Sequence, residues 1–210
     1  MAEMNARSGI VEAQRPRTRR SDILLLPNLL SLARILLTPV FVLMMIQGKP
    51  EQAFIVFLAA GATDALDGFT ARLLHLKSTL GLWLDPIGDK LLLTTAFVVL
   101  TVPAVAGLNV LPVWLTALCI GRDVAIAFGA MIIISLRGMQ TFKPGLIGKA
   151  STICQIFLIY GVLFLNATGR TVGGLRWFFL LTAVLAAASW LQYGIRGVLL
   201  LGRGRPDSAG

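Results

Sequence analysis

The sequence contains little from which a histidine or cysteine site could be built. It has one histidine and two cysteines in 210 residues. Cys119 and Cys154 stand in apolar surroundings, without the paired spacing of a zinc site or a disulfide framework. His75 has no nearby partner of a metal-ligand type, so we interpret it as a solvated loop residue. Zinc, disulfide and histidine-based chemistry are therefore disfavoured.

Acidic residues are also scarce, with ten against nineteen basic residues and a net charge of +9. In a soluble protein this charge would suggest a nucleic-acid partner. Hydrophobic residues, however, make up 56% of the chain, and the mean hydropathy is +0.80, which is more apolar sequence than one soluble core would bury. We therefore expect a membrane protein that binds no nucleic acid.

Six apolar runs are long enough to cross a hydrocarbon layer of about 30 Å as helices. They occupy residues 22–47, 52–73, 79–101, 111–136, 146–168 and 174–201. The sequence thus predicts an all-α integral membrane protein with six transmembrane helices. Residues 22–201 form its one domain, a basic segment precedes it at 1–21, and a short polar tail follows at 202–210.

Charge placement predicts how these helices are oriented. If the N-terminus is cytoplasmic, thirteen basic residues fall on that side. Only three fall outside: Lys49, Arg170 and Arg176. We therefore expect both termini in the cytoplasm and, since no cleavage site follows the basic segment, no removable signal peptide. Three more cations fall within or at the ends of spans, where an ionisable group usually faces a polar cavity: Arg34, Lys90 and Arg122.

Four of the acidic residues are concentrated on two of the predicted spans: Asp64, Asp67, Asp85 and Asp89. Positions 64, 67, 68, 71 and 72 recur at steps of three and four, so they share one face of a helix. Positions 81, 85 and 89 form a second stripe on the next helix. A short connection between the helices can bring the stripes into one pocket near the cytoplasmic end.

Four adjacent carboxylates repel one another unless their pKa values rise or cations bind between them. All-oxygen ligation favours Mg²⁺ or Mn²⁺ over calcium, and four side chains suffice for two ions. Arg72 beside the ions can neutralise a pyrophosphate, while Gly68, Ala71 and Gly81 leave room for its approach. The pattern therefore indicates phosphoryl-type transfer.

Two other interpretations fit four intramembrane carboxylates. They could pair helices in a structural membrane protein, or line the path of a cation or proton transporter. A transporter carries acidic groups across the bilayer, whereas the later spans here add only Asp85, Asp89 and Asp123, all predicted toward one side. This one-sided cluster favours an enzyme.

The same stretch resembles the signature of the CDP-alcohol phosphatidyltransferase family. That signature is Asp-x2-Asp-Gly-x2-Ala-Arg, eight residues, then Gly-x3-Asp-x3-Asp, and all eight specified positions match. The segment from Pro27 to Arg34 also resembles the start of the family's first span. The resemblance covers about residues 22–200.

The resemblance implies a homodimeric six-helix fold, with a dimetal site facing the cytoplasm and CDP-diacylglycerol as the lipid donor. It implies that Asp64, Asp67 and Asp85 are metal ligands. Asp89 would be both a ligand and the base that deprotonates the acceptor hydroxyl. The acceptor oxygen would then attack the lipid-side phosphorus, and CMP would leave. The implied contacts to CDP are Asn28, Gly68, Ala71, Arg72 and Gly81.

The acceptor is less narrowly defined. The sequence from Asp85 to Lys90 resembles the branch of phosphatidylglycerophosphate synthases and CDP-diacylglycerol-dependent cardiolipin synthases, which implies a bacterial inner-membrane enzyme. Their acceptors, glycerol 3-phosphate and phosphatidylglycerol, both carry a phosphate, and an inositol phosphate is an alternative. Three cations are candidates for binding it or are simply cytoplasmic topology charges: Arg122, Lys143 and Lys149. The segments around Arg122 and Lys143 slightly more closely resemble the cardiolipin-synthase pattern.

Overall fold

The structure, a computed structural model, describes residues 26–74, 81–137 and 145–202. Side chains are described in these ranges except at 26–31, 64–87, 89, 130, 132–137 and 196–202. The predicted basic segment 1–21, His75, Lys143 and residues 203–210 of the predicted tail lie outside the described residues. The helices are α2 (Leu26–Ile46), α3 (Pro50–Leu74), α4 (Gly81–Thr101), α5 (Pro103–Ala106), α6 (Val113–Arg137), α7 (Leu146–Ala167) and α8 (Leu175–Gly202).

The prediction of an all-α chain is confirmed over the described residues, which contain helices and no strand. Six long helices correspond to the six predicted apolar runs, and their boundaries agree to within two residues wherever both sides of the boundary are described. The short helix α5 was not predicted. It starts with Pro103, whose missing N–H and fixed φ suit the first turn of a helix.

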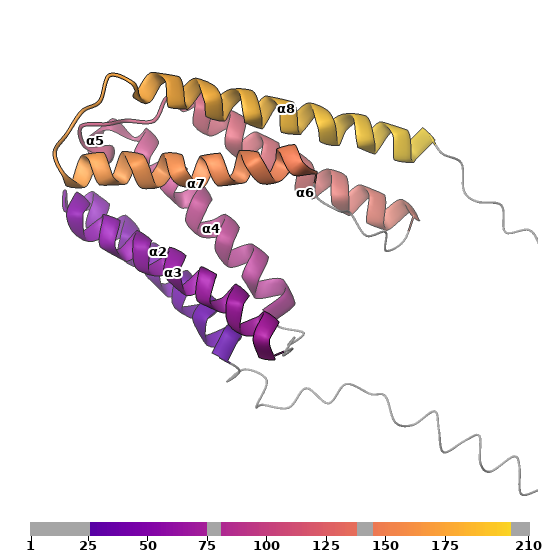
Figure 1. The fold of residues 1–210 in the computed structure, drawn as a ribbon, viewed down its shortest axis with the longest axis horizontal. Helices are drawn as coiled ribbons and strands as arrows, with labels where there is room; N and C mark the ends of the chain where they lie inside the picture. Colours follow the sequence, from indigo (N-terminus) through magenta and orange to yellow (C-terminus); the bar gives the residue numbers. More distant parts are fainter. Residues whose placement is uncertain (1–25, 75–80, 138–144, 203–210) are drawn as a thin grey trace, which may run out of the picture.

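The helices pack as two groups that lie together near α5 and diverge away from it (Figure 1). In one group α2 packs against α3 and α4, and in the other α8 packs against α6 and α7. Contacts of α3 with α7, and of α4 with α6 and α7, join the groups. Aromatic rings fill part of this junction: the Phe57 ring of α3 lies 5.5 Å from that of Phe41 in α2 and 5.0 Å from that of Tyr160 in α7.

The connections divide the molecule into two ends. We call the α5 end the one that carries the connections 47–49, 102–112 and 168–174. We call the terminal end the opposite one, where α2 begins and α8 ends (Figure 1). Lys49 and Arg170 lie in connections at the α5 end, and Arg176 lies in the first turn of α8 there. The three basic residues predicted outside are therefore at one end of the fold.

A buried pair of asparagines fastens the α5 end. Asn166 Oδ1 accepts hydrogen bonds from the Asn109 backbone N–H, at 2.8 Å, and from Asn109 Nδ2, at 2.9 Å. Asn166 Nδ2 donates to the carbonyls of Ala106, at 2.7 Å, and Asn109, at 3.0 Å. Asn109 Nδ2 also donates to the Arg170 carbonyl, at 2.8 Å. We call these two residues the amide lock, since they tie the irregular 102–112 connection to the end of α7.

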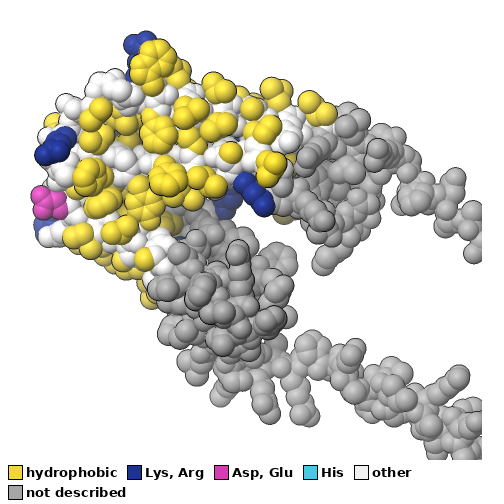
Figure 2. Space-filling view, viewed as in Figure 1, with side chains coloured by type: hydrophobic (Ala, Val, Ile, Leu, Met, Phe, Trp, Pro, Cys, Tyr) yellow, Lys and Arg dark blue, Asp and Glu magenta, His cyan; other side chains and the backbone are white. Residues whose placement is uncertain are grey.

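The surface of the described part is that of a membrane protein. Two segments, Leu146–Ala167 and Leu175–Ile195, are long and apolar enough to cross a bilayer. Only 22% of the second segment is buried, whereas the core helix of a soluble protein is mostly buried. Figure 2 shows hydrophobic side chains spread over the described face, with an acidic group and basic groups at its left edge, the α5 end, and further basic groups at the top and near the middle of the view. The count of six spans stays a prediction.

Candidate active site

The backbone of α3 and α4 carries the four predicted metal ligands. Asp64 and Asp67 belong to α3, and Asp85 and Asp89 belong to α4, so both predicted stripes lie on helices. At 1.5 Å per residue, Asp67 is about 10 Å from the end of α3 and Asp89 about 12 Å from the start of α4. These two positions are therefore at similar depth below the same connection. The aspartate side chains are outside the described residues, and their roles stay predictions.

The predicted CDP contacts are distributed over the same helices. Asn28 lies in the first turn of α2, α4 begins at Gly81, and the rest lie in the last two turns of α3. Those in α3 are Gly68, Ala71 and Arg72. Their side chains also lie outside the described part, so these contacts stay predictions as well.

Arg34 of α2 reaches the aspartate-bearing part of α4. Its side chain is 1% exposed, although it belongs to a predicted membrane span. A Cβ added to Gly88 would lie 3.7 Å from Arg34 Nη1, so the guanidinium lies against the residue before Asp89. A buried cation at this point supports the interpretation of the region around Asp89 as a polar site.

The donor set fits hard divalent ions. The candidate ligands are carboxylates on two successive helices, α3 and α4, that both pack against α2. Among the side chains that the structure describes, no group of three His, Cys, Asp or Glu lies together. The aspartates of residues 64–89 are therefore the remaining candidates, and all-oxygen ligation suits Mg²⁺ or Mn²⁺.

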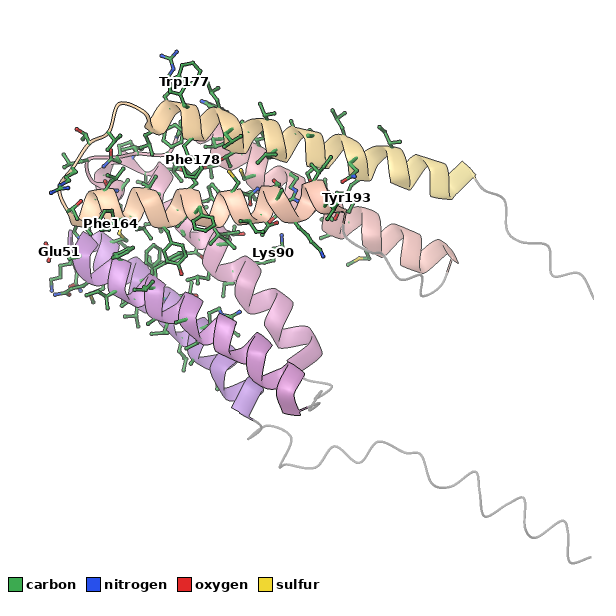
Figure 3. The ribbon with its side chains drawn as sticks, in the orientation of Figure 1. Glu51, Lys90, Phe164, Trp177, Phe178 and Tyr193 are labelled. Carbon is green, nitrogen blue, oxygen red and sulfur yellow. The ribbon has the colours of Figure 1, made fainter. Side chains whose placement is uncertain are left out.

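Beside α4 lies a cavity of about 430 Å³ with three cations in its wall, which we call the cationic pocket. Residues of helices α4, α6, α7 and α8 line this open cavity. Lys90 directly follows Asp89, so this pocket adjoins α4, the helix that carries Asp85 and Asp89. Figure 3 shows Lys90 and Tyr193 in this region, far from Glu51 at the α5 end. The polar and charged side chains that line it are Lys90, Arg122, Asp123, Lys149, Thr152 and Tyr193.

Arg122 is the buried centre of the pocket wall, with 4% of its side chain exposed. Nε and Nη2 donate to Ser189 Oγ, at 3.1 and 2.8 Å. Nη2 also donates to the Gly148 carbonyl at 3.1 Å. Nη1 donates to Asp123 Oδ1 at 2.9 Å and to Thr152 Oγ1 at 3.4 Å. The five N–H groups of a guanidinium thus have protein acceptors, and the residue joins α6 to α7 and α8.

Asp123 divides its two carboxylate oxygens between two cations. Oδ1 accepts from Arg122, and Oδ2 forms an ion pair with Lys90 Nζ. The Asp123 side chain is 13% exposed, whereas that of Lys90 is 54% exposed. Because Lys90 belongs to α4 and Asp123 to α6, this pair connects the group of α2, α3 and α4 to the group of α6, α7 and α8.

A second cavity, of about 370 Å³, lies between α2, α3, α4 and α7. Lys90 and Thr152 line both cavities, and Arg34 lines the second. Its other walls are mainly apolar, with Phe57, Ala60, Gly61, Leu92, Leu93, Ile156 and Tyr160. We call it the apolar cavity. It lies against the α3 and α4 turns that follow the aspartates toward the α5 end.

Of the three predicted acceptor cations, Arg122 and Lys149 line one pocket, and Lys143 is not described. Lys90, predicted only as a site candidate, joins them. Asp123 was not predicted to be part of the pocket, although an acidic residue beside Arg122 in an apolar segment was a usable signal. Thr152, Tyr193 and Ser189 were not predicted either, and the sequence offers no signal for them beyond their polarity.

Comparison with known proteins places the chain among phospholipid enzymes. Residues 24–191 match the family described as CDP-alcohol phosphatidyltransferase. The chain is 31% identical to the CDP-diacylglycerol--glycerol-3-phosphate 3-phosphatidyltransferase of Bacillus subtilis over 156 residues, 67% of this chain and 77% of that protein. It is 32% identical to the enzyme of the same name from Escherichia coli K12 over 171 residues, 80% and 92% of the two chains.

A second kind of relative carries a different name. The chain is 32% identical to human cardiolipin synthase (CMP-forming) over 197 residues, which are 84% of this chain. The chain spans 64% of the length of that human protein. The first two names state glycerol 3-phosphate as the acceptor, whereas the third states cardiolipin as the product and CMP as formed with it.

Proposed function

The chain belongs to the CDP-alcohol phosphatidyltransferase family, and from this premise we propose that it transfers the phosphatidyl group of CDP-diacylglycerol to a glycerol-type acceptor. CMP is the leaving group, and the product is a phospholipid. The match over residues 24–191, which includes the complete aspartate signature, carries the proposal. The enzyme is a membrane protein of phospholipid biosynthesis.

In this mechanism the chain's residues bind the donor and move one proton. Asp64, Asp67, Asp85 and Asp89 would hold two Mg²⁺ or Mn²⁺ ions, which would offset the negative charge of the phosphate oxygens. Arg72 pairs with the pyrophosphate. The other proposed contacts to CDP are Asn28, Gly68, Ala71 and Gly81.

Asp89 accepts the proton of the acceptor hydroxyl. The acceptor oxygen bonds to the lipid-side phosphorus of the donor, and the bond from that phosphorus to the CMP oxygen breaks. The cationic pocket next to Asp89 supports the binding of an acceptor that carries a phosphate, with Lys149, Arg122 and Lys143 as the predicted cations. Glycerol 3-phosphate and phosphatidylglycerol both satisfy this requirement, and both are represented among the names of the relatives.

We further propose that all six long helices cross a bacterial inner membrane, with the terminal end in the cytoplasm and the active site there. The grouping of Lys49, Arg170 and Arg176 at the α5 end supports this orientation. Residues 22–201 would then be the catalytic domain, flanked by the cytoplasmic segments 1–21 and 202–210. A homodimer is part of the same proposal and rests on the family resemblance.

The experiment that tests the function measures CMP release by the purified protein in detergent–lipid micelles. CDP-diacylglycerol and Mg²⁺ or Mn²⁺ are supplied with glycerol 3-phosphate, phosphatidylglycerol or an inositol phosphate in separate reactions. We expect release with one glycerol-type acceptor and none after chelation of the metal. Release with an inositol phosphate alone would overturn the glycerol assignment. Absence of release with every acceptor, together with cation flux in vesicles, would favour the transporter.

A further inference from the structure

The three cations of the cationic pocket differ in how much of their bonding capacity the protein already uses. Arg122 directs all five N–H groups to protein acceptors and is 4% exposed. A phosphate that bound this guanidinium would have to break bonds already formed with Ser189, Gly148 or Thr152. Arg122 is therefore suited to hold the pocket together rather than to bind a substrate that comes and goes.

Lys90 has the opposite properties. Its ammonium has three N–H donors, and in the described part of the chain it makes one ion pair, with Asp123. The side chain is 54% exposed and lines both the cationic pocket and the apolar cavity. Lys149, also exposed, lines the cationic pocket. The donors available for a ligand thus belong to the two lysines.

The charges of the pocket favour an anion. Among its described residues, three basic side chains stand against one carboxylate, that of Asp123. A phosphate placed between Lys90 and Lys149 would offset this excess of positive charge. The boundary between a charged pocket and an apolar cavity is also suited to a phosphate whose substituent is a lipid.

We infer that Lys90 is the contact for the acceptor's phosphate, and that Asp123 is the positioning residue that holds Lys90 at the boundary between the two cavities. This inference rests on the proposed function. Because Lys90 follows Asp89 in α4, a phosphate bound there keeps the acceptor close to the proposed base. The chemistry recognised is a glycerol whose free terminal hydroxyl is three carbons from a phosphate ester.

That unit occurs both in free glycerol 3-phosphate and in the headgroup of phosphatidylglycerol. The long side chain of an unrestrained lysine has much rotamer freedom to lose when it binds. Asp123 reduces this cost because it fixes the ammonium before the acceptor arrives. Arg122, held to the other oxygen of Asp123, fixes the carboxylate in turn.

The test compares Lys90→Gln, Lys90→Arg, Asp123→Asn and Asp123→Glu with the control Lys49→Gln, an exposed lysine at the α5 end. Initial rates of CMP release are measured against acceptor concentration and against CDP-diacylglycerol concentration, with glycerol 3-phosphate and phosphatidylglycerol as separate arms. For Lys90→Gln we expect the acceptor KM to rise about tenfold or more, with the donor KM nearly unchanged. The arm in which the wild type turns over identifies the source of the phosphate.

Asp123→Asn is expected to raise the acceptor KM by a smaller factor, about threefold to tenfold, and Asp123→Glu to restore most of it. A purely structural role for Asp123 would lower the yield of folded protein and leave both KM values of the folded fraction unchanged. That result, or equal increases in the acceptor and donor KM of Lys90→Gln, would overturn the inference.

A binding measurement separates this inference from the proposed function. The rate at which an amine-acylating reagent modifies each lysine of the wild type is followed by mass spectrometry, with and without glycerol 3-phosphate or phosphatidylglycerol micelles. We expect either ligand arm to slow modification of Lys90 several-fold and that of Lys49 not at all. Protection of Lys90 without CMP release would refute the proposed function alone. Turnover without protection of Lys90 would refute the Lys90 assignment alone.

Discussion

The α5 end and the cationic pocket each contain a buried polar cluster that joins helices, but the clusters differ in charge and in closure. The amide lock is neutral, and the Asn166 amide uses both donors and accepts two bonds within the protein. The cationic pocket is charged, and Lys90 and Lys149 in its wall retain donors that the described residues do not use. A cluster that only fastens the fold consumes its own polar groups, whereas a cluster that binds a ligand keeps some available.

Arg122 shows that one site can combine both kinds of group. Its donors are as fully used as those of Asn166, yet it lines the same pocket as the exposed lysines. The pocket therefore has two parts. We call Arg122 and its acceptors the frame, because their bonds are formed within the protein, and we call Lys90 and Lys149 the open contacts, because they retain donors for a ligand. Substitutions in the frame should change stability, and substitutions in the open contacts or the aspartates should change turnover.

Asp89→Asn should produce the largest effect on turnover and none on the amide lock. The amide keeps the size of the carboxylate but is not a base and is a poor metal ligand, so we expect CMP release to fall about 1,000-fold or more. Binding of CDP-diacylglycerol should be largely retained. Glu51→Gln, which removes an exposed carboxylate at the start of α3, is the matched control and should leave the rate unchanged. A wild-type rate in Asp89→Asn would remove this residue from the mechanism.

Arg122→Met tests whether the frame is structural. The substitution replaces a buried cation by an uncharged side chain of similar length. Gly148, Ser189 and Thr152 then lose the donors of Arg122, so we expect a loss of about 3 kcal/mol in the free energy of unfolding. Unfolding in detergent micelles, followed by circular dichroism, measures it. Ser189→Ala removes one acceptor only and should cost about 1 kcal/mol. If Arg122→Met were as stable as the wild type and raised only the acceptor KM, Arg122 would be the phosphate contact that the sequence suggested.

Asn166→Leu makes the corresponding change at the α5 end. The Asn109 backbone N–H and side-chain amide lose their shared acceptor there, and we expect a loss of about 2 kcal/mol in the free energy of unfolding. CMP release per folded molecule should stay at the wild-type value, since this end holds none of the proposed site. Thr168→Ala, an exposed neighbour that bonds only to carbonyls of its own helix, should change stability very little. Loss of turnover in folded Asn166→Leu would contradict the separation of the two ends.

The sequence was sufficient to predict the six long helices, but not the different bonding of the side chains in the cationic pocket. Long apolar runs determine where α3, α4, α6, α7 and α8 begin and end, because a helix satisfies its own backbone in an apolar medium. The spacing of the aspartates within α3 and α4 is a local pattern, and it could be read directly.

Contacts between distant helices could not be read in this way. Arg122 donates a hydrogen bond to Ser189, 67 positions away, and Asn166 accepts one from Asn109, 57 positions away. Such pairs depend on the rotation and crossing of packed helices, which residue spacing does not specify. For this reason the sequence offered Arg122, Lys143 and Lys149 together as candidates for the acceptor's phosphate, and the roles inferred for Arg122 and Lys90 depend on their bonding partners in the structure.

The smallest expected effect comes from two glycines that differ in what surrounds them. A Cβ at Gly61, in the wall of the apolar cavity, would overlap the Tyr160 hydroxyl oxygen and lie 3.3 Å from the Tyr160 Cζ. A Cβ at Gly161, on α7, would meet nothing within 4 Å. We expect Gly61→Ala to lower the free energy of unfolding by about 1 kcal/mol and Gly161→Ala to raise it by about 0.5 kcal/mol.

Tyr160→Phe supplies the decisive background for this pair, because it removes the hydroxyl oxygen that the new methyl group would overlap. Measured against Tyr160→Phe alone, Gly61→Ala should then cost less than half of what it costs in the wild type. An equal cost in both backgrounds would mean that the overlap with Tyr160 is not the reason for glycine at this position. The apolar cavity would then be shaped by α3 itself rather than by the contact between α3 and α7.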